Sequence, residues 1–117
     1  MKLQVLSDLH IDSYAKRQKP LGTIAQTDAD LILVAGDTAN SDAGMQWLQQ
    51  QVELNNKPVI TIAGNHEYFS EDVFALDDKL SQWDTFDKAS SKGLRFLQCQ
   101  QLDFGEIRIL GCTLWTD

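Results

Sequence analysis

Residues 31–37, with the sequence LILVAGD, decide the fold expected for this chain. Five apolar residues in a row, followed at once by Gly36 and Asp37, are typical of a strand buried on both faces of a parallel sheet. A second run of the same kind, VITIA, occupies residues 59–63. Residues 3–7 predict a third strand, whose more alternating pattern favours a place nearer the sheet edge or burial on one face only.

Helical segments are expected between and after these strands. Residues 42–54 predict one helix. A second helix has Ser70 as its N-cap and apolar residues on one face of a 3.6-residue period, namely Val73, Leu76, Leu80 and Trp83. For residues 12–27 the pattern predicts only one short helix, after Pro20.

Short strands are predicted in the last quarter of the chain, at residues 94–99, 102–104 and 107–112. Gly105 and Glu106 separate the last two and suit a type II′ hairpin, which requires glycine first. The whole order predicts an α/β domain with a mainly parallel sheet. We expect the strands at the C-terminal end to extend that sheet as antiparallel members.

Composition limits the classes of partner. The 117 residues suffice for a single domain, with 10 basic and 17 acidic residues and a net charge of −7. This charge argues against binding to long nucleic acids, which depends on lysine and arginine. It does not exclude a small phosphoester, because bound divalent metals can invert the local sign of an acidic pocket. No apolar run is long enough to span a bilayer, so we expect a cytoplasmic protein without a membrane contact.

The two cysteines, Cys99 and Cys112, lie outside any Cys-x-x-Cys pattern and in strand-like surroundings. We therefore expect two buried, reduced thiols rather than a redox pair or zinc ligands.

Polar residues with metal-binding chemistry follow each of the three predicted parallel strands. In open α/β sheets ligands bind beyond the carboxyl ends of the strands, so these loops should converge on one crevice. The three motifs are Asp8-Leu9-His10, Gly36-Asp37 and Gly64-Asn65-His66-Glu67, and they include both histidines of the chain.

These residue types suit a divalent cation. Carboxylate, imidazole and amide oxygen form a borderline-hard donor set for manganese, iron, zinc or magnesium. Asp8 and His10 would reach one ion from the same side of an extended segment, while Gly36 and Gly64 allow tight turns. Each motif alone is also compatible with ordinary turn chemistry, and Glu67 with favouring the N-terminus of a following helix. Their order and placement together indicate a site.

The three motifs resemble those of the calcineurin-like metallophosphoesterases, and the closing residues 110–117 also resemble bacterial members. The resemblance implies the N-terminal half of a four-layer α/β/β/α sandwich. It implies that Asp8 and His10 bind a first metal, that Asn65 binds a second and that Asp37 bridges both. It also implies that His66 is no ligand but acts on the substrate phosphate. The implied reaction is hydrolysis of a phosphomonoester or phosphodiester by a hydroxide activated by two metals.

Two departures from the family pattern affect these expectations. Many members carry aspartate where this chain has Asn40, which can accept a hydrogen bond but brings no charge. The family also uses later histidines, and none follows His66 here. We therefore expect residues 1–117 to be a truncated N-terminal portion of one domain, with an incomplete site. Such a chain would hold at most one ion weakly and would be weakly active or inactive.

An alternative interpretation from another class is a non-catalytic association module. A half-sandwich would leave an apolar sheet face uncovered, and large exposed apolar patches tend to become interfaces. We therefore expect self-association through that face.

Overall fold

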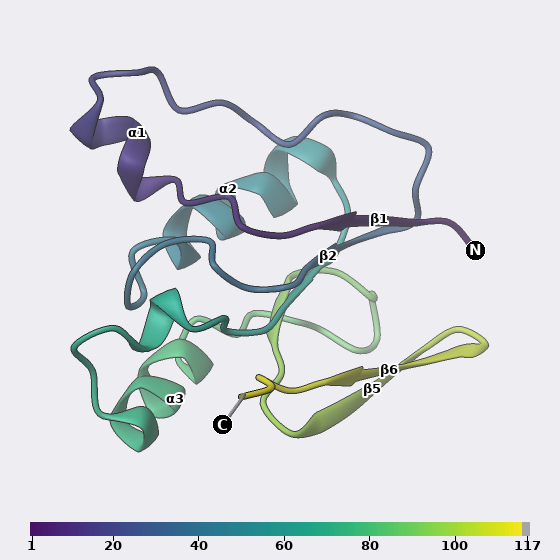
Figure 1. Ribbon diagram of the computed structural model, residues 1–117. Coiled ribbons are helices and arrows are strands. Elements are labelled where there is room, and N and C mark those ends of the chain that lie inside the picture. The colour runs from purple at the N-terminus through teal and green to yellow at the C-terminus, as the bar shows by residue number, and fades with distance from the viewer. Residues whose placement is uncertain (116–117) are drawn as a thin grey trace.

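A four-stranded parallel sheet forms the centre of the molecule (Figure 1), with strands in the order β1-β2-β3-β4. The computed structural model describes residues 1–115. The strands of this sheet are β1 (Leu3–Leu6), β2 (Leu31–Val34), β3 (Val59–Thr61) and β4 (Leu94–Phe96). The α/β class and the parallel arrangement predicted from the sequence are confirmed.

Burial on both faces explains the two continuous apolar runs. Leu31, Ile32 and Val59 are fully buried, although neighbouring residues in a strand point to opposite faces. In contrast, β1 alternates between exposed and half-buried residues. It pairs only with β2, from Leu3 opposite Leu31 onward, and is an edge strand as predicted.

Helices cover one face of the sheet. The two helices on this face are α2 (Met45–Asn55) and α3 (Val73–Ser81). Together with the strands they form the first apolar core. Its buried residues include Leu48 and Val52 of α2, Leu76 and Leu80 of α3, and Ile32, Val34, Val59, Leu94 and Phe96 of the strands. The predicted Ser70 N-cap is wrong. Ser70 lies in a turn with φ +60°, and the Asp72 side chain caps α3 by accepting a hydrogen bond from the N–H of Ala75 at 2.9 Å.

Residues 12–27 do not contain a helix after Pro20, contrary to the prediction. The short helix α1 (Asp12–Lys16) precedes that proline, and the chain then continues without regular structure toward β2. The buried Ile24 holds this stretch against α2, since its N–H donates a hydrogen bond to Gln51 Oε1 at 2.8 Å. A contact between distant segments therefore stabilises the stretch, which a local pattern does not reveal.

The C-terminal strands differ from the prediction in where they pair. β4 joins the main sheet as a parallel strand, with Leu94 opposite Val59. β5 (Gln100–Phe104) and β6 (Ile107–Gly111) instead form a separate antiparallel sheet. The two-residue loop between them has φ +60° at Gly105, as a type II′ turn requires.

Burial of the second sheet face explains this placement of the hairpin. Leu31 and Ile60 form a second core with Leu97 and Leu102, against which Phe104, Ile107 and Ile109 of the hairpin also pack. The face that we expected to be uncovered is thus covered in part. Leu3 and Val5 of β1 remain 42% and 63% exposed.

The prediction of two buried thiols is wrong. Cys99 is exposed and Cys112 is half-buried. Both stand at the ends of the hairpin strands, outside the two apolar cores. Within residues 1–115, no helix combines the length and apolar character needed to cross a membrane.

Candidate metal centre

The loops after β1, β2 and β3 meet at the carboxyl edge of the sheet. Asp8, Asp37 and Asn65 line one open cavity there, of about 800 Å³. His10 lies beside them, with its Nε2 3.8 Å from Asp8 Oδ1 and 3.9 Å from Asp37 Oδ2. The structure thus brings together the four residues that the sequence marks as candidate ligands.

Backbone hydrogen bonds hold the first loop along the second. The N–H groups of Asp8 and His10 donate to the carbonyl oxygens of Gly36 and Asp37, at 3.1 and 3.0 Å. Asp8 and His10 have φ of +54° and +45°, so the segment is not extended as we expected. Left-handed backbone at non-glycine residues is unfavourable and concentrates at functional sites. Asp37, with φ +55°, shares this conformation.

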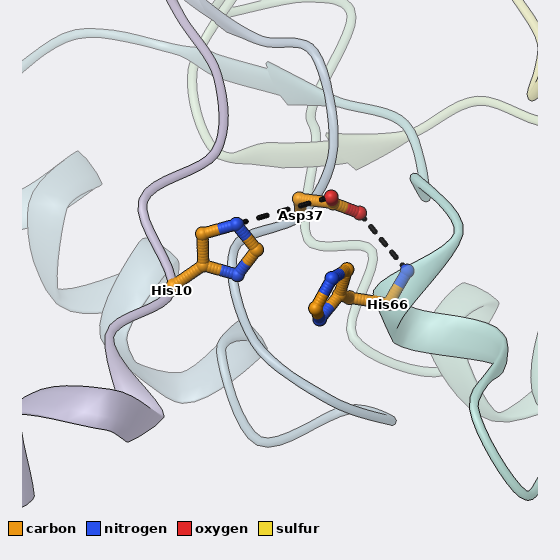
Figure 2. A group of neighbouring side chains, drawn as sticks. All are labelled: His10, Asp37 and His66. Atoms are coloured by element: carbon orange, nitrogen blue, oxygen red, sulfur yellow. Dashed lines mark hydrogen bonds and ion pairs between the residues drawn. The ribbon is translucent and has the colours of Figure 1, made fainter.

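Asp37 is the central carboxylate of the group (Figure 2). It is only 9% exposed, and its Oδ1 accepts a hydrogen bond from the backbone N–H of His66 at 3.0 Å. Its Oδ2 faces the His10 ring, and the His10 and His66 rings lie 4.5 Å apart. Asp37 therefore connects the loops of all three motifs.

Glu67 is the residue whose role the sequence did not reveal. It is 5% exposed. Its Oε2 accepts from the N–H groups of Asp37 and Gly64, and its Oε1 from that of Thr38, at 2.9 to 3.0 Å. Burial raises the pKa of this carboxyl, although the backbone donors act in the opposite direction. Glu67 therefore ties the loop after β2 to the loop after β3, rather than favouring the N-terminus of a helix.

The two glycines of the site have different functions. Gly36 adopts φ +86°, which supports the tight turn predicted there. Gly64 has no such φ, but a Cβ on it would overlap Asp37 Oδ1 and lie 2.8 Å from the Asp37 backbone nitrogen. Gly64 is thus required for the close approach of two loops.

Asn40 does not bond to His66 in the part of the chain that the structure describes. Its backbone N–H donates to Asp12 Oδ2 at 3.1 Å, which joins the second loop to α1. Tyr68 lies farther along the cavity, and its hydroxyl donates to Asp77 Oδ1 at 2.5 Å. Burial and the bond to Asp77 raise the Tyr68 pKa to about 12, so this hydroxyl is not a general base near neutral pH.

The donor atoms fit a divalent cation. One atom each from His10, Asp37 and His66 lie within 4.8 Å of one another. Two imidazoles and one carboxylate match the borderline preference of zinc, iron and manganese. This geometry brings His66 within reach of the same ion as His10, whereas the family resemblance implied that it acts on the substrate.

Comparison with known proteins agrees with this arrangement. Residues 1–110 match the family model described as calcineurin-like phosphoesterase. No curated protein and no solved structure matches the chain. The family consists of hydrolases that depend on divalent metals and act on phosphoesters, and its model covers all three loops of the site. The chain therefore belongs to the calcineurin-like phosphoesterase family.

Proposed function

We propose that this chain binds divalent cations at the loops after β1, β2 and β3 and hydrolyses small phosphomonoesters or phosphodiesters there. The observation that carries the proposal is that donor atoms of His10 and Asp37, two proposed ligands, and of His66, the proposed substrate-directed group, lie within 4.8 Å of one another. Family membership supports the reaction class, since metal-dependent phosphoester hydrolysis is the general chemistry of the family.

The proposed ligands are Asp8 and His10 for one ion and Asn65 for a second, with Asp37 shared between them. Two distances support the first group, because Asp8 Oδ1 and Asp37 Oδ2 both lie within 4 Å of His10 Nε2. The assignment of Asn65 to the second ion is supported only by its place in the lining of the same cavity. When bound, such ions polarise a phosphoryl oxygen and lower the pKa of water.

His66 is proposed to act on the substrate. Its backbone N–H is fixed by Asp37, and its ring packs against Phe69 with centroids 4.4 Å apart. A ring held in this way is ready to donate a proton to a leaving oxygen or a hydrogen bond to phosphate.

Metal binding is expected to be weak and to saturate at one equivalent. The first proposed ion has three donors, whereas the second has only Asp37 and Asn65 within residues 1–115. We expect Asp37→Ala to abolish saturable binding of Mn²⁺ in a calorimetric titration, because losing a shared carboxylate removes the central donor. Asp28→Ala is the matched control, since Asp28 is an exposed carboxylate whose partner among residues 1–115 is Lys2 at the surface.

His66→Ala, measured in the same titration, separates the two assignments of this histidine. As a substrate-directed group, it should leave the binding of Mn²⁺ close to that of the parent chain. Mn²⁺-dependent hydrolysis of an aryl phosphodiester, expected to be slow in the parent, should fall to background. A loss of metal affinity equal to that of Asp37→Ala would instead make His66 a ligand. Unchanged binding in Asp37→Ala would contradict the proposed centre.

Self-association is a second candidate function, favoured by the exposed apolar residues of the edge strand. The register places Leu3 and Val5 on the same sheet face as Leu31, beyond the area that the hairpin covers. We expect the chain to form dimers or larger species in sedimentation velocity experiments and Val5→Lys to shift it toward monomer. Leu54→Lys, at an exposed position on α2, is the control. A monomeric parent at high concentration would contradict this candidate.

A further inference from the structure

Two thiols meet at the open end of the hairpin. Cys99 directly precedes β5 and Cys112 directly follows β6, and the outermost ladder pair is Gln100 opposite Gly111. The two cysteines therefore occupy the next facing positions. Their sulfur atoms lie 2.6 Å apart, and both are free thiols in this structure.

We propose that Cys99 and Cys112 form a reversible intramolecular disulfide when a peroxide oxidises the chain. A disulfide bond is about 2.0 Å long, so the two sulfurs need only a small movement to bond. The hairpin holds them on facing strands, which makes this closure far more favourable than reaction with a thiol from another molecule.

Accessibility determines the order of events. Cys99 is exposed, whereas Cys112 is half-buried. The Cys99 thiolate attacks a peroxide oxygen and becomes a sulfenic acid while the O–O bond breaks. The hydroxide that leaves takes up the proton lost by the thiol and becomes the first water. The Cys112 sulfur then attacks Cys99 Sγ, loses its proton and releases a second water. Two thiols and one hydrogen peroxide thus give one disulfide and two waters.

The thiol pair is suited to a labile bond rather than a permanent one. The hydrogen bond between the two sulfurs raises the pKa of the Cys99 thiol, because it stabilises the protonated form. Only a small thiolate fraction is then available near neutral pH, so the reaction of Cys99 with the peroxide is slow. Exposed disulfides are also those most easily reduced again.

Closure of this bond would act on the wall of the candidate metal centre. Cys112 lines the same cavity as Asp37 and Asn65. Its neighbour Thr113 donates its hydroxyl to the Ala63 carbonyl oxygen at 2.6 Å and its N–H to Gln98 Oε1 at 3.1 Å. Gln98, next to Cys99, also donates to the Tyr68 hydroxyl. The disulfide would join the two ends of this hydrogen-bonded group, whether or not the centre binds a metal.

Treatment of the reduced, desalted chain with hydrogen peroxide tests the proposal. We expect a monomer whose mass is lower by two hydrogen atoms, a Cys99–Cys112 crosslinked peptide in a non-reducing digest, and full reversal by dithiothreitol. The melting temperature should rise on the order of 10 °C on oxidation, because the crosslink restricts the unfolded chain. None of these readouts depends on hydrolysis, so they are independent of the function proposed above.

Cys112→Ser is the matched control, because it retains the exposed Cys99 and removes its partner. In that variant the peroxide should yield oxidised Cys99 or crosslinked dimers, with no crosslinked peptide within one chain and no rise in melting temperature. Three results for the parent chain would overturn the proposal: both thiols still alkylated after the oxidant, both oxidised separately to sulfinic acids, or crosslinks only between molecules.

Discussion

Glu67→Ala is expected to destabilise the chain by about 3 kcal/mol or more, because it leaves the backbone N–H groups of Asp37, Thr38 and Gly64 without an acceptor. Each buried donor that loses its partner costs about 1–3 kcal/mol. Small domains have only about 5–15 kcal/mol of total stability, so the loss would be apparent in a urea denaturation curve.

Two controls separate the role of Glu67 from a general effect of removing a carboxylate. Glu53→Ala, at an exposed position of α2, should change stability by less than about 0.5 kcal/mol. Glu67→Gln preserves the shape of the side chain, but its NH₂ group cannot accept a hydrogen bond, so we expect an intermediate loss. If Glu67→Ala and Glu53→Ala denature at the same urea concentration, Glu67 does not connect the two loops.

The raised pKa of Glu67 adds a pH dependence of known sign. Because the folded chain holds this proton more tightly than the unfolded chain, the stability that comes from this shift is fully present below the ordinary pKa of 4.5. It is lost as the pH rises through the higher folded-state pKa. The parent chain should therefore lose stability relative to Glu67→Gln as pH increases across that interval.

Gly64→Ala is expected to weaken Mn²⁺ binding by about 10–100-fold, because the new methyl group would displace the Asp37 carboxylate from its position. The overlap involves both the side chain and the backbone nitrogen of Asp37, so neither a rotamer change nor a small shift of one side chain relieves it. We also expect a loss of stability of about 1–3 kcal/mol from overpacking. Calorimetric titration and urea denaturation of the same preparation measure the two effects.

Gly22→Ala is the control for this substitution. A Cβ at Gly22 would meet no atom within 4 Å, so the change should leave both metal affinity and stability close to those of the parent. If Gly64→Ala binds Mn²⁺ as the parent does, the position of Asp37 is not set by the close approach of the two loops.

The apolar runs of the sequence, and their order along it, predicted the class of the fold well. The apolar runs at 31–35 and 59–63 indicated strands buried on both faces, and the structure places both in the centre of the sheet. The motifs that followed these strands indicated one crevice, since parallel strands end at the same edge. Such inferences succeed because burial follows from the spacing of apolar residues, and parallel strand direction from the long connections between the strands, both of which the sequence displays directly.

Features that depend on contacts between distant segments were not predictable in this way. The hairpin's place on the second sheet face reflects packing of Leu97 and Leu102 on Leu31 and Ile60. Glu67 looked like a residue of a helix start, although two of its three partners, Asp37 and Thr38, lie in the loop after β2. The proximity of Cys99 and Cys112 likewise depends on where the hairpin begins and ends. Spacing alone did not show these pairings.

The order of the strands in space is the order in which they are synthesised, from β1 to β4. Each new strand can therefore dock beside its predecessor on a nascent chain, without waiting for a later segment to be inserted between them. At about 5–20 residues per second, a crossover of about 30 residues is made within a few seconds. Leu31 and Ile60 nevertheless stay exposed at least until Leu97 and the hairpin leave the ribosome, because these later residues pack on them. Between the synthesis of β3 and that of β6, this apolar face is therefore open to aggregation, the hazard that chaperones counter.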